Sequence, residues 1–294
     1  MGRAWQRLEW FGLLVLSSFV QALPGAVREG LFAWVMGKFG MLLPANRVIY
    51  RNLRKTAGLE LVGEQRQFAQ NVWHFWGKSL AAILKPGPIA LEVEGDKHAM
   101  ELLRDPAQPI VVATAHFGPM ELLRRPGVLN HGGVGIMYRR YNNPLVEAGI
   151  QKALLASNGP IFTKRRSGAV QALKHLKDAG KLLIMVDQHL SKGVEVNVLG
   201  HPAMMARGAI QMAEHVQCPV VPARLTRRSG RWRVIVSPAM KGLRDVADDH
   251  QRLADQISGW ITREPHLWLW LHRRWRVDAS GLKGRDISAT SYES

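Results

Sequence analysis

The feature that most constrains the fold is an alternation, from residue 89 onward, of short apolar runs with segments of helical spacing. Short apolar runs rich in β-branched residues are typical of buried strands, and helices between successive strands make those strands parallel. The strand-like runs are 110–115, 133–138, 160–162 and 182–186, and helices are expected from about residues 119, 144 and 167. The pattern predicts a mainly parallel sheet covered by helices, with functional residues at the carboxyl ends of strands.

Other segments add detail to this plan. Residues 218–226 and 231–239 are strand-like and flank Arg228-Ser229-Gly230, which predicts an antiparallel hairpin; 194–199 is also strand-like. The helical spacing of residues 64–84 ends before a Lys-Pro-Gly-Pro stop, so a helix should precede the sheet. The expected fold class is therefore α/β, with a mixed, mainly parallel central sheet flanked by helices.

The amino-terminal region, residues 1–63, has a different composition. Its apolar run from Trp10 to Leu23 is shorter than the ~20 residues of a spanning helix. A second apolar stretch, Leu31 to Leu43, precedes a basic run from Arg47 to Lys55. Apolar residues beside Arg and Lys are typical of a segment lying on an anionic leaflet, although a helical hairpin packed on the domain fits as well. We predict a membrane-associating region at 1–63, a main domain at 64–278 and a flexible tail at 279–294.

The net charge of +17 predicts anionic partners, but the charge alone does not choose among nucleic acid, acidic lipid and an acidic carrier protein. The single cysteine, Cys218, excludes an internal disulfide framework. His131 and His189 lack the ligand spacing of known zinc motifs. We therefore expect neither a metal nor a cofactor.

The strongest chemical signal is the stretch ATAHFGPMELL at residues 113–123, which follows the first strand-like run. If His116 ends the strand and Pro119 opens a helix, Glu121 falls in the first helical turn. Glu121 is then expected to accept a hydrogen bond from one imidazole nitrogen, which leaves the other free to take a proton from a hydroxyl. One such pair is weak evidence, since Glu121 at a helix start and His116 at a strand end also suit purely structural roles.

Polar side chains follow three further strand-like runs. Arg139 and Arg165 are candidates for holding phosphate groups, because a guanidinium binds phosphate in a bidentate manner. Asp187 and Gln188 follow the run 182–186; Asp187 is expected to pair with Arg165, to bind the acceptor sugar or to cap a loop.

Seven blocks in order resemble the late acyltransferases of lipid A biosynthesis, the lauroyl/myristoyl acyltransferase family, which is related to the lysophospholipid and glycerolipid acyltransferases. The blocks are Arg51-Asn52-Leu53; His116-Phe117-Gly118 with Glu121; YRRYNNPL at 138–145; Gly159, Phe162, Arg165 and Gly168; Asp187-Gln188 with Gly193; PVVP at 219–222; and WLWLHRRW at 268–275. The last block and YRRYNNPL are the most specific.

This resemblance implies an O-acyltransferase that moves a fatty acyl chain from acyl carrier protein, or coenzyme A, to a hydroxyl of a glycolipid, the lipid A precursor. The implied location is the cytoplasmic face of the bacterial inner membrane. It makes His116 the general base and Glu121 its partner. The pair Pro119-Met120 departs from the family, in which an Asn-Trp or similar pair often precedes the glutamate, so local acceptor contacts here are in question.

Two alternatives stay open from the sequence. A lysophospholipid or aminolipid acceptor fits the same chemistry. A non-catalytic basic protein that binds membrane or nucleic acid is the alternative from another class, since tryptophans interleaved with arginines at 260–275 are also found on single-strand stacking surfaces. No nucleic-acid motif accompanies them, and we expect no nucleic-acid partner.

Overall fold

The computed structural model describes residues 22–56, 65–84, 91–138, 140, 143–155 and 159–275, together with residues 6, 7, 11 and 18. Its centre is a seven-stranded sheet in the order β1-β9-β8-β2-β5-β3-β4, and β6 and β7 form a separate hairpin. The strands are β1 (Glu92–Gly95), β2 (Ile110–Thr114), β3 (Gly135–Tyr138), β4 (Ile161–Thr163), β5 (Lys181–Met185), β6 (Val194–Val198), β7 (His201–Met205), β8 (Val220–Arg228) and β9 (Arg231–Val236).

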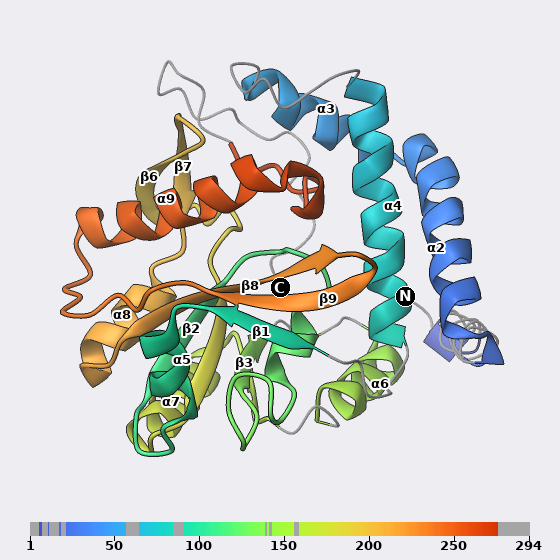
Figure 1. The fold of residues 1–294 in the computed structure, drawn as a ribbon. Helices are drawn as coiled ribbons and strands as arrows, with labels where there is room; N and C mark the ends of the chain where they lie inside the picture. Colours follow the sequence, from blue (N-terminus) through green and yellow to red (C-terminus); the bar gives the residue numbers. More distant parts are fainter. Residues whose placement is uncertain are drawn as a thin grey trace.

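Helices surround this sheet (Figure 1). In the view of Figure 1, α9 lies above the strands, α5, α7 and α8 lie below them, and α2 and α4 stand side by side at the right. The α-helices are α2 (Gly25–Phe39), α3 (Asn46–Lys55), α4 (Gln65–Leu84), α5 (Lys97–Arg104), α6 (Pro144–Leu155), α7 (Arg166–Lys177), α8 (Gly208–Val216) and α9 (Ala247–Arg263). The 3-10 helices are η1 (Gly40–Leu42), η2 (Met120–Arg124) and η3 (Pro265–Leu267).

The predicted fold class is confirmed. Strands β8, β2, β5, β3 and β4 are parallel to one another, and β9 pairs antiparallel with β8 and parallel with β1. The β8–β9 hairpin turns at Ser229 and Gly230, whose φ angles of 49° and 77° are those of a tight hairpin turn. Every residue of β2 is buried, which explains its continuous apolar run.

One predicted element differs. A helix was expected from Pro119, but the chain forms only the five-residue 3-10 helix η2, which Pro119 precedes with a φ of −78° and a ψ of 75°. That ψ keeps Pro119 itself outside the helix. Glu121 still lies in the first turn of η2.

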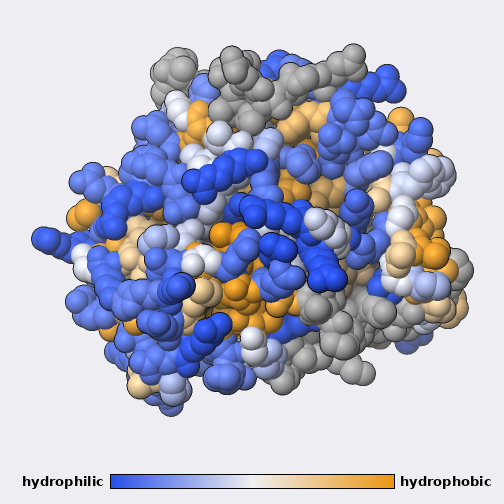
Figure 2. Space-filling view, in the orientation of Figure 1, coloured by the Kyte–Doolittle hydropathy of each residue, from blue (hydrophilic) through white to orange (hydrophobic). Residues whose placement is uncertain are grey.

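Helix α2 packs along α4. Gly77 of α4 allows the two backbones to approach, because a Cβ there would lie 2.3 Å from the carbonyl oxygen of Phe32. The outer face of α2 exposes Val27, Leu31 and Trp34 at helical spacing. Figure 2 shows apolar colours at the right edge of the molecule, where Figure 1 places α2.

Within the described ranges, no helix combines the length and the apolar character that crossing a bilayer requires. Most of the predicted segment from Trp10 to Leu23, and the whole predicted tail at 279–294, lie outside the described residues.

Candidate active site

The sheet register brings His116 and Asp187 together. Thr114, the last residue of β2, pairs with Met185, the last residue of the neighbouring parallel strand β5. His116 and Asp187 each follow two residues later, so both leave the sheet at the same carboxyl edge. This is the edge at which α/β proteins place their sites.

Both oxygens of Asp187 are used. Its Oδ1 lies 2.8 Å from Nδ1 of His116. Its Oδ2 accepts the backbone N–H of His116 at 2.8 Å and the indole N–H of Trp268 at 2.8 Å. The carboxylate therefore fixes the imidazole at two points, through its ring and through its backbone.

Electrostatics keep this carboxylate charged. Burial alone would raise the pKa of Asp187, which is 1% exposed, but the charge and the hydrogen bonds of His116 outweigh burial and hold that pKa well below its usual range. An ionised Asp187 can only accept, so Nδ1 of His116 carries a hydrogen, and whenever the ring is neutral Nε2 presents its lone pair. The amide nitrogen of Gln188 lies 3.3 Å from that Nε2. His116 thus has the tautomer of a general base.

A glycine shapes the turn after His116. Gly118 has a φ of 74°, and a Cβ at this position would lie 2.9 Å from the ring of Trp232 and 3.2 Å from that of Phe75. Any larger residue would be strained by the backbone conformation and would press on both rings. The local geometry therefore requires glycine at position 118.

The expected hydrogen bond between His116 and Glu121 is absent from the structure, because Asp187 occupies Nδ1. Oε2 of Glu121 is buried and accepts no hydrogen bond in the described part of the chain. Burial raises the pKa of Glu121, and its own backbone N–H, His116 and Arg124 offset this only in part. A buried acceptor without a donor costs about 1–3 kcal/mol, and a ligand that donates a hydrogen bond to Oε2 would remove this cost.

Arg124 organises the backbone beside Glu121. Its side chain is fully buried and donates to the carbonyls of Val134 at 2.9 Å, Leu154 at 3.0 Å and Gly159 at 2.8 Å. Burial lowers its pKa to about 10, which leaves it charged at neutral pH. Arg124 therefore joins η2 to the chain around β3 and α6.

The carboxyl-terminal segment 268–275 completes the site. The backbone N–H of Leu269 donates to the carbonyl of His116 at 3.0 Å, and Phe117 and Trp268 form an isolated antiparallel bridge. The Asn52 amide donates to the carbonyls of Trp270 at 2.8 Å and His272 at 2.6 Å. In the sequence, Asn52, Trp268 and His272 stand out only as members of the family blocks, with no role predicted for them. Their roles depend on contacts across more than 80 residues of chain, which no local pattern reveals.

His272 lies directly against His116. Its ring centre is 4.8 Å from that of His116, edge to face, and its Nε2 is buried with no hydrogen-bond partner among the described residues. Burial and the nearby charge of His116 lower its pKa to about 4. His272 is therefore neutral at physiological pH and does not compete with His116 for a proton.

The structure does not bring all of the remaining predicted residues to His116. Arg139 lies outside the described residues. Arg165 is exposed and precedes α7, at the end of the edge strand β4. Asp187 pairs with His116 and Trp268, so the expected pairing with Arg165 is wrong. Gln188 lies in the site, against His116.

The tryptophans of the carboxyl-terminal segment form a packed cluster. Trp268, Trp270 and Trp275 are at most 2% exposed, with ring centres 5.0–6.5 Å apart. Their indole N–H groups donate to Asp187, to the carbonyl of Pro265 and to that of Val198. Rings buried in this way offer no face on which a base could stack, which removes the feature that suggested single-strand binding.

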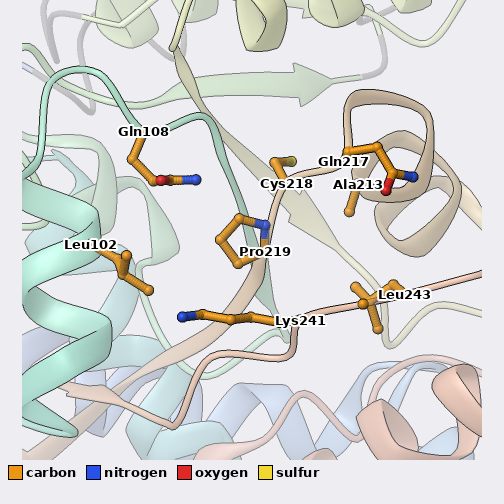
Figure 3. A pocket seen from close by; sticks show the side chains of 9 residues that line it. Leu102, Gln108, Ala213, Gln217, Cys218, Pro219, Lys241 and Leu243 are labelled. Carbon is orange, nitrogen blue, oxygen red and sulfur yellow. The ribbon is translucent and has the colours of Figure 1, made fainter.

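A cavity of about 270 Å³ lies at the opposite edge of the sheet. Figure 3 shows Gln108, which precedes β2, and Cys218 and Pro219, which precede β8, around it with Lys241. Burial raises the pKa of Cys218 to about 11, so this thiol is a poor nucleophile. Among the described residues, no group of three or more His, Cys, Asp or Glu side chains is placed to hold a metal.

A family model for bacterial lipid A biosynthesis acyltransferases matches residues 3–277. The chain belongs to this family. The predicted resemblance is thereby confirmed, and the acyltransferase places His116 at the carboxyl edge of its sheet. No individual curated protein matches this acyltransferase significantly.

Proposed function

We propose that this acyltransferase moves a fatty acyl chain from an acyl thioester, with acyl carrier protein as the expected donor, to a hydroxyl of a lipid A precursor. The observation that carries the proposal is the 2.8 Å contact between Nδ1 of His116 and buried Asp187, with Nε2 facing Gln188. A base held in one tautomer, with its second nitrogen against a displaceable amide, suits removal of a proton from an alcohol.

The reaction then has two steps. A substrate hydroxyl takes the place of the Gln188 amide and gives its proton to Nε2 of His116, while its oxygen bonds to the thioester carbonyl carbon. The tetrahedral intermediate expels the thiolate as the C–S bond breaks, and the imidazolium returns its proton to the sulfur. Asp187 stabilises the imidazolium between the steps, as a buried carboxylate does for a histidine base.

The acyl group passes directly between substrates in this proposal. The described hydrogen bonds of the His116 side chain go to Asp187 and Gln188, and neither of these is a hydroxyl or thiol nucleophile. Cys218, the single cysteine, lies at the other edge of the sheet. We therefore infer no acyl-enzyme.

Glu121 keeps its predicted place as a catalytic residue, in a different role. Its unpartnered Oε2 is free to hydrogen-bond the acceptor or the thioester, and its raised pKa favours a carboxyl that donates. Arg139 and Arg165 remain proposed contacts for substrate phosphates.

We further propose that the enzyme works at the cytoplasmic face of the bacterial inner membrane. The apolar outer face of α2 precedes α3, whose exposed face carries Arg47, Arg51 and Arg54 at helical spacing. This combination suits an anionic leaflet. The net charge of +17 would also attract an acidic carrier protein and a phosphorylated acceptor.

The test compares lipid A from cells that carry the intact gene, no gene, or the His116→Ala variant, by mass spectrometry. One acyl chain should be absent without the gene and with His116→Ala, and the purified variant should lose at least ~10²-fold in rate with either acyl carrier protein or coenzyme A as donor. The exposed His131→Ala is the matched control and should keep full activity.

Three outcomes would contradict parts of the proposal. A lipid A profile that does not change with the gene, with altered phospholipids or aminolipids instead, would replace the acceptor. A faster reaction with acyl coenzyme A would replace the donor. Full activity of His116→Ala would exclude the base and favour a non-catalytic binding protein.

A further inference from the structure

A second cavity, which we call the basic groove, lies between α4, the β8–β9 turn and η3. It has a volume of about 440 Å³. In Figure 1 the β8–β9 turn reaches the middle of α4. The groove is lined by Asn71, His74, Phe75, Lys78, Arg227, Gly230, His266 and Leu267.

The groove contains cations with unused hydrogen-bonding capacity. Lys78 has no carboxylate partner within the described ranges. Arg227 binds Glu29 through Nη2 at 2.5 Å, while its buried Nη1 has no hydrogen-bond partner in the part of the chain that the structure describes. Among the described residues, those that line the groove include no Asp or Glu. Desolvated donors of this kind are stabilised when an oxyanion binds them.

Of the two histidines in the groove, His74 lies near positive charges alone, whereas His266 lies near both a negative and a positive charge. Burial lowers the pKa of His74, and the charges of Lys78 and Lys38 lower it further. Burial also lowers the pKa of His266; Lys78 adds to this, and Glu264 opposes it. Glu264 is itself paired with Arg224 at 2.5 Å, so its negative charge is largely compensated. An anion in the groove would oppose the lowering of these pKa values by Lys38 and Lys78.

An aromatic wall separates the groove from the catalytic base. Phe75 and Trp232 lie with ring centres 5.7 Å apart, and Arg227 stacks on Trp232 at 5.1 Å. Gly118, two residues after His116, lies against these same rings, and the lining of the groove includes none of His116, Asp187 and Gln188. The groove is therefore distinct from the site built around His116.

We propose that the basic groove binds the phosphate ester of an anionic membrane lipid. The position favours a lipid over free phosphate, because the ring of His74 lies against Gly37 of α2. The outer face of α2 exposes apolar side chains, and Figure 2 shows them at the molecular edge. A lipid headgroup in the groove would hold the enzyme on the leaflet, close to the turn that contains His116 and Gly118. This inference does not depend on the role of His116.

The test measures binding of the full chain to vesicles of phosphatidylcholine alone or mixed with phosphatidylglycerol, by flotation. Lys78→Glu should weaken binding to the mixed vesicles more than tenfold, because reversal changes two charges, each worth about 1 kcal/mol near the surface, or about fivefold. The matched control Lys192→Glu makes the same change at an exposed residue that does not line the groove and should cost less than about twofold. Lys78→Gln, which adds no negative charge, should show a smaller loss, and thermal unfolding checks that each variant folds.

A pH series gives a second readout. Phosphatidylglycerol is a diester, so its charge is constant in this range, whereas a bound phosphate raises the pKa of His74 and His266 against Lys38 and Lys78. Binding should therefore tighten as pH falls from about 8 to about 6, and His74→Gln with His266→Gln should flatten this dependence.

Specific outcomes would overturn the proposal. Equal losses in Lys78→Glu and Lys192→Glu would show a general charge effect. Release by millimolar inorganic phosphate, with direct phosphate binding in calorimetry, would assign the groove to a free anion. A raised KM for the acceptor in detergent, with vesicle binding unchanged, would assign it to the substrate.

Discussion

The described part of the chain contains two histidine–aspartate pairs with nearly the same nitrogen–oxygen distance. Nδ1 of His116 lies 2.8 Å from Asp187 at the carboxyl edge of the sheet, and Nε2 of His250 lies 2.7 Å from Asp245 at the start of α9. Both aspartates have a pKa below the usual range, because a histidine and hydrogen bonds outweigh burial. Distance and charge alone do not distinguish the pairs.

The surroundings of the second nitrogen do distinguish them. Nε2 of His116 faces the amide of Gln188, which a hydroxyl can displace, and the residue retains 8% exposure. His250 is fully buried, and its Nδ1 contacts no hydrogen-bond partner among the described residues. Asp245 is also shared with Arg207 at 2.5 Å. Of these two pairs, only the one with His116 therefore has the partly exposed outer nitrogen that the proposed role of a base requires.

The largest expected difference between the pairs is in activity. Asp187→Asn should lower kcat by about 10²–10⁴-fold, because its amide cannot accept from all the N–H groups that the carboxylate accepts and favours the wrong tautomer of His116. Asp245→Asn is the matched change and should leave kcat per folded molecule unchanged. Steady-state kinetics with denaturant unfolding of both variants checks this. Similar kcat losses in the two variants would remove the distinction.

The next effect is on stability. His250→Ala should lower the free energy of unfolding by about 2–4 kcal/mol, because it opens a cavity under α9 and leaves Asp245 with one partner fewer. The activity of the remaining folded protein should be normal. Urea unfolding gives the free energy, and His131→Ala serves as the exposed control. A stable His250→Ala enzyme with a reduced kcat would make the second pair functional.

Glu121→Gln should change stability and activity in opposite directions. The raised pKa of Glu121 means that folding costs free energy once the pH exceeds the unfolded value, and this cost is complete above the folded pKa. Glu121→Gln removes the charge, so it should stabilise the fold at neutral pH while lowering kcat/KM about 10–100-fold. Thermal unfolding and kinetics test the two signs. A destabilised variant with normal activity would make Glu121 structural.

Much of the sheet was predictable because its rules are local. The strand runs and the hairpin at Ser229-Gly230 follow from apolar runs and turn chemistry, and α6 and α7 begin within a residue of the predicted positions. The helix expected after Gly118 failed because Pro119 takes a ψ of 75° and only a short 3-10 helix follows. Periodicity could not show this, since five residues carry too little of it.

The site was predictable only in part, for a geometric reason. His116 and the strand-end position of Asp187 came from the sequence, but their pairing depends on β2 and β5 being neighbours, although β3 and β4 lie between them in the chain. Once that strand order is known, the contact between His116 and Asp187 can be predicted, because each residue lies two positions after the end of its strand and the two strand ends are paired. Glu121 is nearer to His116 in sequence, but Nδ1 of His116 donates to Asp187 instead.

The smallest expected effect concerns acid stability and the Asp245 pair. Asp245 has a lowered folded pKa, so its contribution to stability is present above its unfolded pKa, near 4, and disappears as the pH falls through the folded value. Arg207 is half exposed, so this contribution is at most about 1 kcal/mol. The unfolding free energies of the wild type and Asp245→Asn should therefore differ at pH 7 and converge below about pH 4, whereas the exposed Asp248→Asn should track the wild type throughout. A constant difference down to pH 2 would mean that the loss in Asp245→Asn comes from the shape of the loop and not from its charge.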